Sequence, residues 1–293
     1  MDMQKKQSLK ILQKTMCHGN TLKNNRIYFS SLLKTISAYQ PAANNLFAAL
    51  DLYNIKYEFI LSTKDIWVRD FMPIKRKDGK YISFRYEPSY LKDRPELCTD
   101  FKRNIGDDFL NGEILYSNIC LDGGNVVFSP SKQKVIVSSR VFSENPKWEK
   151  AKLTYALERI LQAEVFIISS LKSDMTGHAD GMVRFIDENT CIGNRTEYKY
   201  GLEQTIKRML NKRGIEVIDF PYVPDHGISA VGCYLNFLEI GNIIFLPVFD
   251  IAEDEEAIRT AKTIFINKNI VPICINEIAK DGGCLNCISW SND

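Results

Sequence analysis

The order of strand-like and helix-like segments is the feature that most constrains the fold of this chain. Short apolar or alternating runs bounded by Gly, Pro, Asn or Asp predict strands, and apolar residues three or four positions apart predict helices. The order strand, strand, helix, strand returns about every 50 to 60 residues, although no sequence repeat is detectable at that period. The pattern therefore predicts one α/β domain built from a repeated structural unit.

The predicted segments follow each other with short connections. The predicted strands cover residues 26–33, 56–62, 81–86, 113–116, 125–128, 134–138, 165–170, 181–186, 190–194, 216–220, 234–239, 243–249 and 270–275. The predicted helices cover residues 42–53, 146–162, 202–212 and 252–267. Helix 146–162 has the clearest pattern, with Trp148, Leu153, Leu157, Ile160 and Leu161 as its apolar positions. Lysines interleaved with apolar residues over positions 5–14 predict an amphipathic surface helix.

The length fits one large domain or two small ones, and the composition is ordinary for a soluble globular protein. The 293 residues form one predicted domain over 1–293, with residues 1–25 as an N-terminal extension to which no role is assigned. The net charge of +2 gives no strong field, so we expect neither nucleic acid nor membrane as a partner. No apolar run approaches the roughly 20 residues of a membrane helix, and no secretory signal is recognisable. We expect a cytoplasmic protein and leave a homodimer open.

The eight cysteines are scattered and do not resemble a compact disulfide framework. Most are expected to pack as small apolar residues in the core. Cys284 and Cys287 form a Cys-x-x-Cys pair, which in isolation is compatible with redox chemistry or with half of a zinc site. No second Cys-x-x-Cys and no His-x-x-x-His occurs, so no metal site is expected.

Cys287 has a second interpretation, as a nucleophile. It follows the pair Gly282-Gly283, and glycines allow a tight turn that presents a side chain to a ligand. His178 and Asp180 lie between Gly177 and Gly181, and they share a face if that segment is extended. Asp70 and Asp122 lie in two other Gly- or Pro-containing turns. Each of these residues, taken alone, is equally compatible with a structural role in a turn.

A cationic, planar substrate accounts for this combination of residue types. Acyl transfer by a cysteine and a histidine needs no additional carboxylates. A guanidinium group presents N–H donors that match carboxylates bidentately. Two aspartates would bind its nitrogens, a thiolate would attack its carbon, and a histidine would transfer protons to ammonia and from water.

The same residues give the chain a family resemblance. It resembles the agmatine deiminases and bacterial peptidylarginine deiminases, which belong to the guanidine-modifying pentein superfamily. The matching segments, in the family's order, are residues 67–73 (WxRDxxP-like), 122–125 (acidic-Gly-Gly-Asn), 177–185 (GHxDxxxRF-like), 236–237 with 241–249, and 282–289 (GGxxxCIS). The resemblance implies a pentein five-bladed α/β propeller with pseudo-fivefold ββαβ repeats and a central active site.

The resemblance also implies roles for individual residues. Cys287 would be the nucleophile, His178 the acid/base, and Asp70 and Asp180 the residues that bind the guanidinium. Further expected substrate-binding residues lie in the matching segments: Asp122, Trp67, Asn125, Asn236 and Gly283. No cofactor is implied, and the expected partner is a small cationic guanidine.

The chain departs from the agmatine deiminases at two places. Asn286 stands where they usually carry His, and the run at residues 84–91 replaces their Asn-Ala-Trp-Gly-Gly-like segment. The predicted function is hydrolysis of a guanidine to a ureido group and ammonia, with agmatine as the first substrate. The alternatives are a deiminase of peptidyl or free arginine, an amidinotransferase, and a catalytically idle pentein that binds a guanidine.

Overall fold

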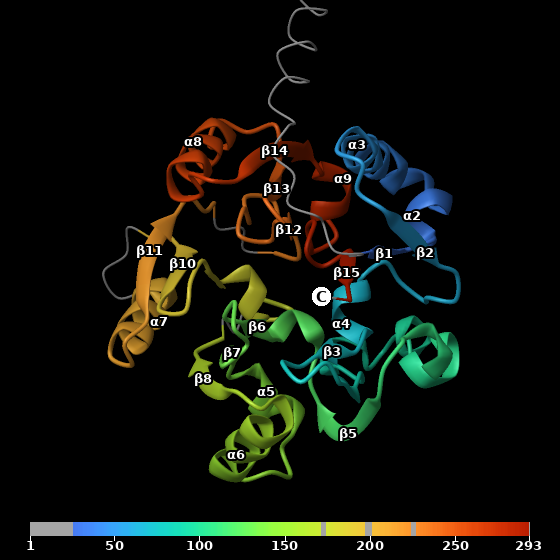
Figure 1. The fold of residues 1–293 in the computed structure, drawn as a ribbon, viewed down its shortest axis with the longest axis vertical. Helices are drawn as coiled ribbons and strands as arrows, with labels where there is room; N and C mark the ends of the chain where they lie inside the picture. Colours follow the sequence, from blue (N-terminus) through green and yellow to red (C-terminus); the bar gives the residue numbers. More distant parts are fainter. Residues whose placement is uncertain (1–25, 171–173, 197–200, 224–226, 293) are drawn as a thin grey trace, which may run out of the picture.

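Five three-stranded sheets surround one centre in the computed structural model, which describes residues 26–170, 174–196, 201–223 and 227–292 (Figure 1). Every sheet has the same plan. Its middle strand pairs antiparallel with one neighbour and parallel with the other. The repeated unit predicted from the sequence is therefore confirmed, and the architecture is a five-bladed α/β arrangement.

The strands have the following bounds. In sheet order they are β15 (Ser289–Ser291), β1 (Ile27–Ser30) and β2 (Tyr57–Ile60); β3 (Ile74–Lys75), β4 (Tyr81–Arg85) and β5 (Ile114–Cys120); β6 (Val127–Phe128), β7 (Lys134–Ser138) and β8 (Glu164–Ile168); β9 (Val183–Phe185), β10 (Thr190–Asn194) and β11 (Glu216–Phe220); and β12 (Leu238–Ile240), β13 (Ile243–Val248) and β14 (Asn269–Cys274). The middle strands β7 and β10 have the bounds predicted from the sequence.

Helices connect the parallel strands, because such strands need a crossover. They are α2 (Leu32–Thr35) and α3 (Gln40–Leu52) in the first sheet, α5 (Arg140–Glu144) and α6 (Lys150–Leu161) in the third, α7 (Leu202–Asn211) in the fourth, and α8 (Asp254–Ile264) with the following α9 (Asn276–Ala279) in the fifth. The second sheet has only short turns there, namely η2 (Ser89–Leu91), η3 (Pro95–Leu97), the π-helical η4 (Phe101–Ile105) and η5 (Asp107–Phe109).

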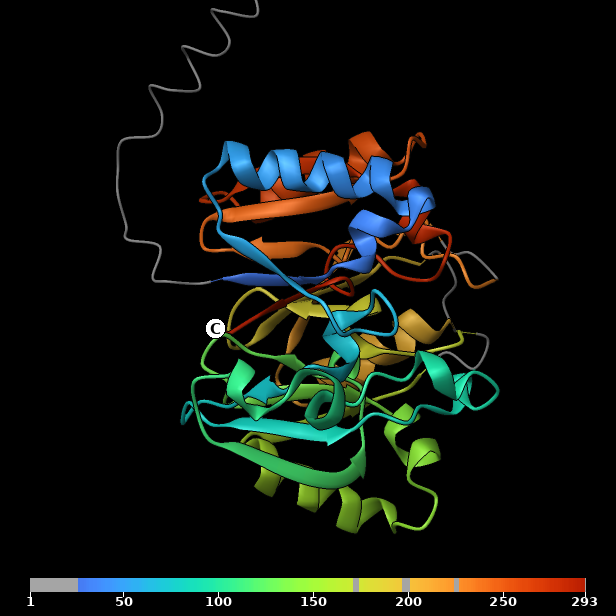
Figure 2. The ribbon, with the colours of Figure 1, turned by 90° about the vertical axis from the view of Figure 1, so that its right-hand side faces the viewer.

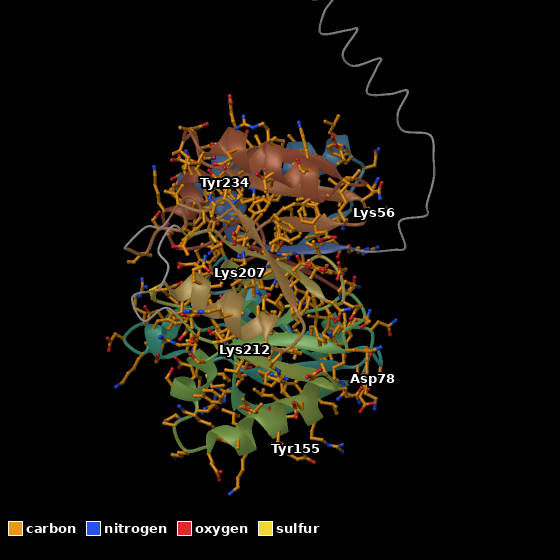
Figure 3. The ribbon with its side chains drawn as sticks, turned by 90° about the vertical axis from the view of Figure 1, so that its left-hand side faces the viewer. Lys56, Asp78, Tyr155, Lys207, Lys212 and Tyr234 are labelled. Carbon is orange, nitrogen blue, oxygen red and sulfur yellow. The ribbon has the colours of Figure 1, made fainter. Side chains whose placement is uncertain are left out.

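The crossover helices lie on the outside of the ring. Leu153, Leu157 and Leu161 of α6 recur every four residues, so they share one face, and all three are fully buried. Tyr155, on the same helix, projects outward (Figure 3). Figure 2 shows α3 of the first sheet beside β14 of the fifth, and the two belong to one hydrophobic core.

The ring closes between segments from opposite parts of the sequence. β15 pairs antiparallel with β1, so that Ile27 lies opposite Ser291. The indole N–H of Trp290 donates to the carbonyl of Pro73 (2.9 Å), which joins β15 to the start of the second sheet. The segment just after Cys287 thus completes the first sheet.

Three predictions about elements were wrong. Trp148 lies before α6 and is exposed, because residues 145–148 form a turn in which the Trp148 N–H donates to the Asn145 carbonyl. The strand predicted for 234–239 begins only at Leu238, since the residues before it form a turn that carries Asn236. The strand predicted for 26–33 ends at Ser30, where α2 follows.

The surface helix predicted for residues 5–14 lies outside the described residues. Among the helices of the described residues, none is long and apolar enough to cross a membrane.

Candidate active site

The connections between consecutive sheets carry the predicted site residues to the centre of the ring. Asp70 lies on α4 (Val68–Phe71), and Asp122 precedes η6 (Gly123–Asn125). His178 precedes η7 (Ala179–Gly181), which contains Asp180. Asn236 lies in the turn before β12, and Cys287 in the turn before β15. Five connections, far apart in the sequence, therefore supply one site.

A pocket of about 130 Å³ opens at this centre. Its lining includes seven of the predicted residues: Trp67, Asp70, His178, Asp180, Asn236, Gly283 and Cys287. Asp70, His178 and Asp180 are almost fully buried, whereas Cys287 is half-buried. A buried polar cluster around an accessible thiol is typical of a site that acts on a polar ligand.

His178 lies between two carboxylates. Its Nε2 is 2.8 Å from Asp122 Oδ2, and its Nδ1 is 3.5 Å from Asp70 Oδ1. Burial lowers the pKa of His178, but Asp70 and Asp122 more than offset this and raise it to about 10. The imidazole is therefore protonated at neutral pH, which suits it to donate a proton first.

The segment of His178 and Asp180 is a 3₁₀ turn rather than the extended segment that was considered from the sequence. Both side chains nevertheless line the pocket. Asp180 Oδ2 lies 3.9 Å from the Cys287 sulfur. Burial, followed by the charges of Asp180 and Asp70, raises the pKa of the Cys287 thiol well above its usual value.

Asp70 is held in this acidic surrounding by the neighbouring backbone. The Gly124 N–H donates to Asp70 Oδ1 (3.1 Å). A Cβ at Gly124 would lie 2.7 Å from both Asp70 Oδ1 and His178 Nδ1, so only glycine fits this close approach. Burial raises the pKa of Asp70 to about 8; the charge of His178 opposes this, and Asp122 and Asp180 reinforce it.

The turn of Cys287 is fixed against its surroundings. Arg69 N–H donates to the Cys287 carbonyl (3.1 Å), and the Cys284 and Cys287 N–H groups donate to Asn236 Oδ1 (3.2 Å each). A Cβ at Gly283 would lie 2.5 Å from a ring carbon of Trp67, so glycine at 283 lets the indole pack against the turn. The position of the thiol is thus set by backbone hydrogen bonds and by the absence of a side chain at Gly283.

Asp122 and Asn125 do not line the pocket. Asp122 lies behind His178, and its Oδ1 is buried without a hydrogen-bond partner in the described part of the chain. Asn125 Oδ1 accepts from the N–H groups of Ser138 (2.8 Å) and Ala179 (3.2 Å), so its amide braces η7 against β7. The structure separates these two residues from the seven that face the pocket.

Sequence reasoning missed Tyr90 as a site residue. Its hydroxyl donates to Asp122 Oδ2 (3.1 Å), and its ring meets the His178 ring edge-on at 6.3 Å between centroids. Tyr90 lies in the long connection between β4 and β5, where no motif marks it. It belongs to the run at residues 84–91 that departs from the agmatine deiminase pattern, and this departure was the one available signal.

Cys284 is fully buried and its thiol contacts the carbonyl of Ala230 (3.5 Å), as expected for a packed cysteine. Both Cys284 and Cys287 are free thiols. In the described residues, no group of three or more His, Cys, Asp or Glu side chains has an arrangement that could hold a metal ion.

The fold and the central site define a class of protein: this is a pentein, with five three-stranded sheets of one plan around one polar pocket. Solved structures with the same fold include the agmatine deiminase of C. jejuni (20% identical, 91% of this chain and 92% of that chain covered, TM-score 0.69) and that of Enterococcus faecalis (17%, 91% and 92%, TM-score 0.70). At these identities they show the fold.

Within that class, the chain belongs to the Porphyromonas-type peptidyl-arginine deiminase family, whose sequence model matches residues 13–292. A curated relative, the agmatine deiminase of Pseudomonas aeruginosa strain LESB58, is 30% identical over 89% of this chain and 85% of its own length.

Proposed function

We propose that this protein is a cysteine-dependent guanidine deiminase and that agmatine, which it would convert to N-carbamoylputrescine and ammonia, is its substrate. The observation that carries the proposal is the meeting of a half-buried thiol, a histidine held between two carboxylates, and a second pocket carboxylate 3.9 Å from the sulfur. The family membership and the agmatine deiminase relative support the same activity.

In the proposed reaction, Asp70 and Asp180 bind the guanidinium and its positive charge offsets their field at Cys287. This favours loss of the thiol proton to solvent, and the thiolate attacks the guanidinium carbon and forms a C–S bond. The protonated His178 gives a proton to the departing nitrogen, so that ammonia leaves and an amidino thioether remains. Asp122, behind the ring, and Tyr90, which lines the pocket beside it, keep His178 oriented.

Water completes the reaction. Neutral His178 takes a proton from the water molecule that attacks the same carbon. The C–S bond then breaks and the ureido product leaves. A proton returns to the sulfur, which restores the thiol and the protonated His178 of the starting state. A C. jejuni agmatine deiminase with its cysteine changed to serine has been solved with substrate bound, which supports a cysteine-dependent site of this kind.

The charges of the outer pocket favour agmatine over free arginine. Four acidic residues line it besides the central ones, namely Asp174, Glu203, Asp219 and Asp281. Among the described lining residues the only basic side chain besides His178 is Lys207, which is paired with Asp219 at 2.9 Å. Figure 3 shows Lys207 on α7, the helix that connects two strands of the fourth sheet. Agmatine carries a second positive charge that this acidic lining would stabilise, whereas the α-carboxylate of arginine would find no unpaired lysine or arginine among the described lining residues.

A substrate panel tests the proposal. Agmatine, free arginine and a doubly blocked arginine peptide are incubated with the protein, and ureido product and ammonia are both measured, with Cys287→Ala as the control. We expect the largest kcat/KM with agmatine. A preference for the blocked peptide would make the protein a peptidylarginine deiminase. Transfer of the amidino group to an added amine, without ureido product, would make it an amidinotransferase. If no guanidine gave a product, the proposal would be refuted.

A cytoplasmic location, a homodimer and a single catalytic domain over 1–293 stay predictions.

A further inference from the structure

Asp180 is held by two side-chain amides that meet on one of its oxygens. Asn286 Nδ2 lies 2.8 Å from Asp180 Oδ2, and Asn236 Nδ2 lies 3.0 Å from the same atom. All three residues are buried. An ionised carboxylate only accepts hydrogen bonds, so both asparagines must turn their NH₂ groups toward it.

Asn286 is fixed on its backbone as well. Its N–H donates to the Asn236 carbonyl (3.1 Å), and its own carbonyl accepts from Arg69 Nε (3.3 Å). Its backbone is therefore fixed, and from that position its side chain donates to Asp180. Asn236 is tied to the same turn because its Oδ1 accepts the N–H groups of Cys284 and Cys287.

The hydrogen bonds that the described residues make with the Asp180 carboxylate all end on Oδ2, and the Cys287 sulfur lies 3.9 Å from that oxygen. Two donors on Oδ2 fix the rotation of the carboxylate and partly balance its charge where it faces the thiol. Oδ1 then remains for the guanidinium.

We propose that Asn286 is a positioning residue: with Asn236 it holds Oδ2 of Asp180 beside Cys287 so that Oδ1 can bind the substrate, and it must be a hydrogen-bond donor without negative charge to do so. The role of Oδ1 rests on the proposed deiminase function, whereas the effect of residue 286 on Asp180 and Cys287 does not.

Three substitutions separate the donor from the shape and the charge of residue 286. Asn286→Leu keeps the shape and removes the donor. Asn286→His keeps a donor, because imidazole Nδ1 stands as far along the side chain as the amide nitrogen. Asn286→Asp keeps the shape but places a second carboxylate against Asp180, so that the pair needs a shared proton to avoid repulsion.

The kinetic expectations differ for the three variants. Losing a donor to a buried charge should lower kcat/KM about tenfold to a hundredfold in Asn286→Leu, with KM raised as well as kcat lowered. Asn286→His should recover most of the loss. Asn286→Asp should be the least active at high pH, and its activity relative to the unsubstituted protein should rise as pH falls, because the shared proton restores a donor.

A readout without substrate keeps this inference separate from the proposed function. Alkylation of Cys287 by iodoacetamide is followed against pH by mass spectrometry of the peptide that contains it. Asn286→Asp should move the midpoint to higher pH, since it adds a negative charge beside the thiol, whereas Asn211→Asp, an exposed control on α7, should not.

The outcomes are distinct. If no guanidine is converted by the unsubstituted protein, the deiminase proposal fails, and the alkylation profiles still decide whether residue 286 acts on Asp180 and Cys287. Unchanged alkylation in Asn286→Asp, or full activity in a folded Asn286→Leu, would overturn the inference. If Asn286→Leu does not fold, the comparison of Asn286→His with Asn286→Asp gives the answer.

Discussion

Replacing Asp180 by Asn should have opposite effects on the reactivity of the thiol and on turnover. Asparagine keeps the size of the side chain and an oxygen that accepts from Asn286 and Asn236, but it removes the negative charge. That charge lies 3.9 Å from the Cys287 sulfur. A unit charge at this distance changes the free-energy difference between thiol and thiolate by about 4 kcal/mol at an effective dielectric constant of about 20, or roughly a thousandfold in their ratio.

The assay is alkylation of Cys287 by iodoacetamide near neutral pH, in the absence of substrate. Because the unsubstituted thiol is mostly protonated there, we expect alkylation of Asp180→Asn to be faster by at least about tenfold and up to about a thousandfold. Guanidine turnover should fall in the same variant, since one of the two carboxylates that we propose bind the guanidinium has lost its charge.

The exposed Asp93→Asn is the matched control for a lost carboxylate, and its alkylation should not change. If Asp180→Asn were alkylated at the rate of the unsubstituted protein, the carboxylate would not control the thiol. The electrostatic argument for Cys287 would then be wrong, whatever the turnover.

Four further predictions concern the same site. Cys287→Ser should lower kcat by at least roughly a thousandfold without unfolding the protein, while Cys284→Ser keeps most activity; near-normal ureido production by the former would contradict the assignment. Tyr90→Phe should lower kcat about tenfold, because Asp122 loses a hydrogen bond behind His178, and an unchanged kcat would remove Tyr90 from the machinery. The raised pKa of His178 contributes stability that is fully present below 6.5 and is lost as pH rises toward about 10, so the free energy of unfolding in urea should fall over that range, and less steeply in His178→Gln. Prolonged chelation should leave ureido production intact; a loss reversed by one divalent ion would favour a metal-dependent mechanism.

The fold was predictable from the sequence to the level of the repeating unit. The runs 134–138 and 190–194 form strands that are buried on both faces, so their bounds are sharp. The two-residue strands β3 and β6 and the three-residue β15 are too short to show a period, and their strand geometry comes from the neighbour with which they pair. The strand that begins at Leu238, β12, also has only three residues and shows no period, which is why the residues before it were wrongly assigned to a strand.

The site was predictable where residues lie in turns marked by glycine or proline. Cys287, His178, Asp180 and Asp70 are such residues, and the structure brings all four to one pocket. Tyr90 carries no such mark, since its contact with Asp122 depends on how the long β4–β5 connection folds back. Residues that come together only because the five sheets form a ring have no fixed spacing in the sequence, so no pattern could link them.

The pairing of β1 with β15 has a consequence for how the protein loses activity. Cys287 lies two residues before β15, and the hydrogen bonds of its turn to Arg69 and Asn236 hold the thiol next to the strand that closes the ring. A fluctuation that detaches β15 and also breaks these hydrogen bonds would expose backbone amides of β1 and β15 to hydrogen exchange and move the thiol away from His178 and Asp180. On heating, the loss of activity and the first loss of amide protection in β1 and β15 should therefore occur at the same temperature.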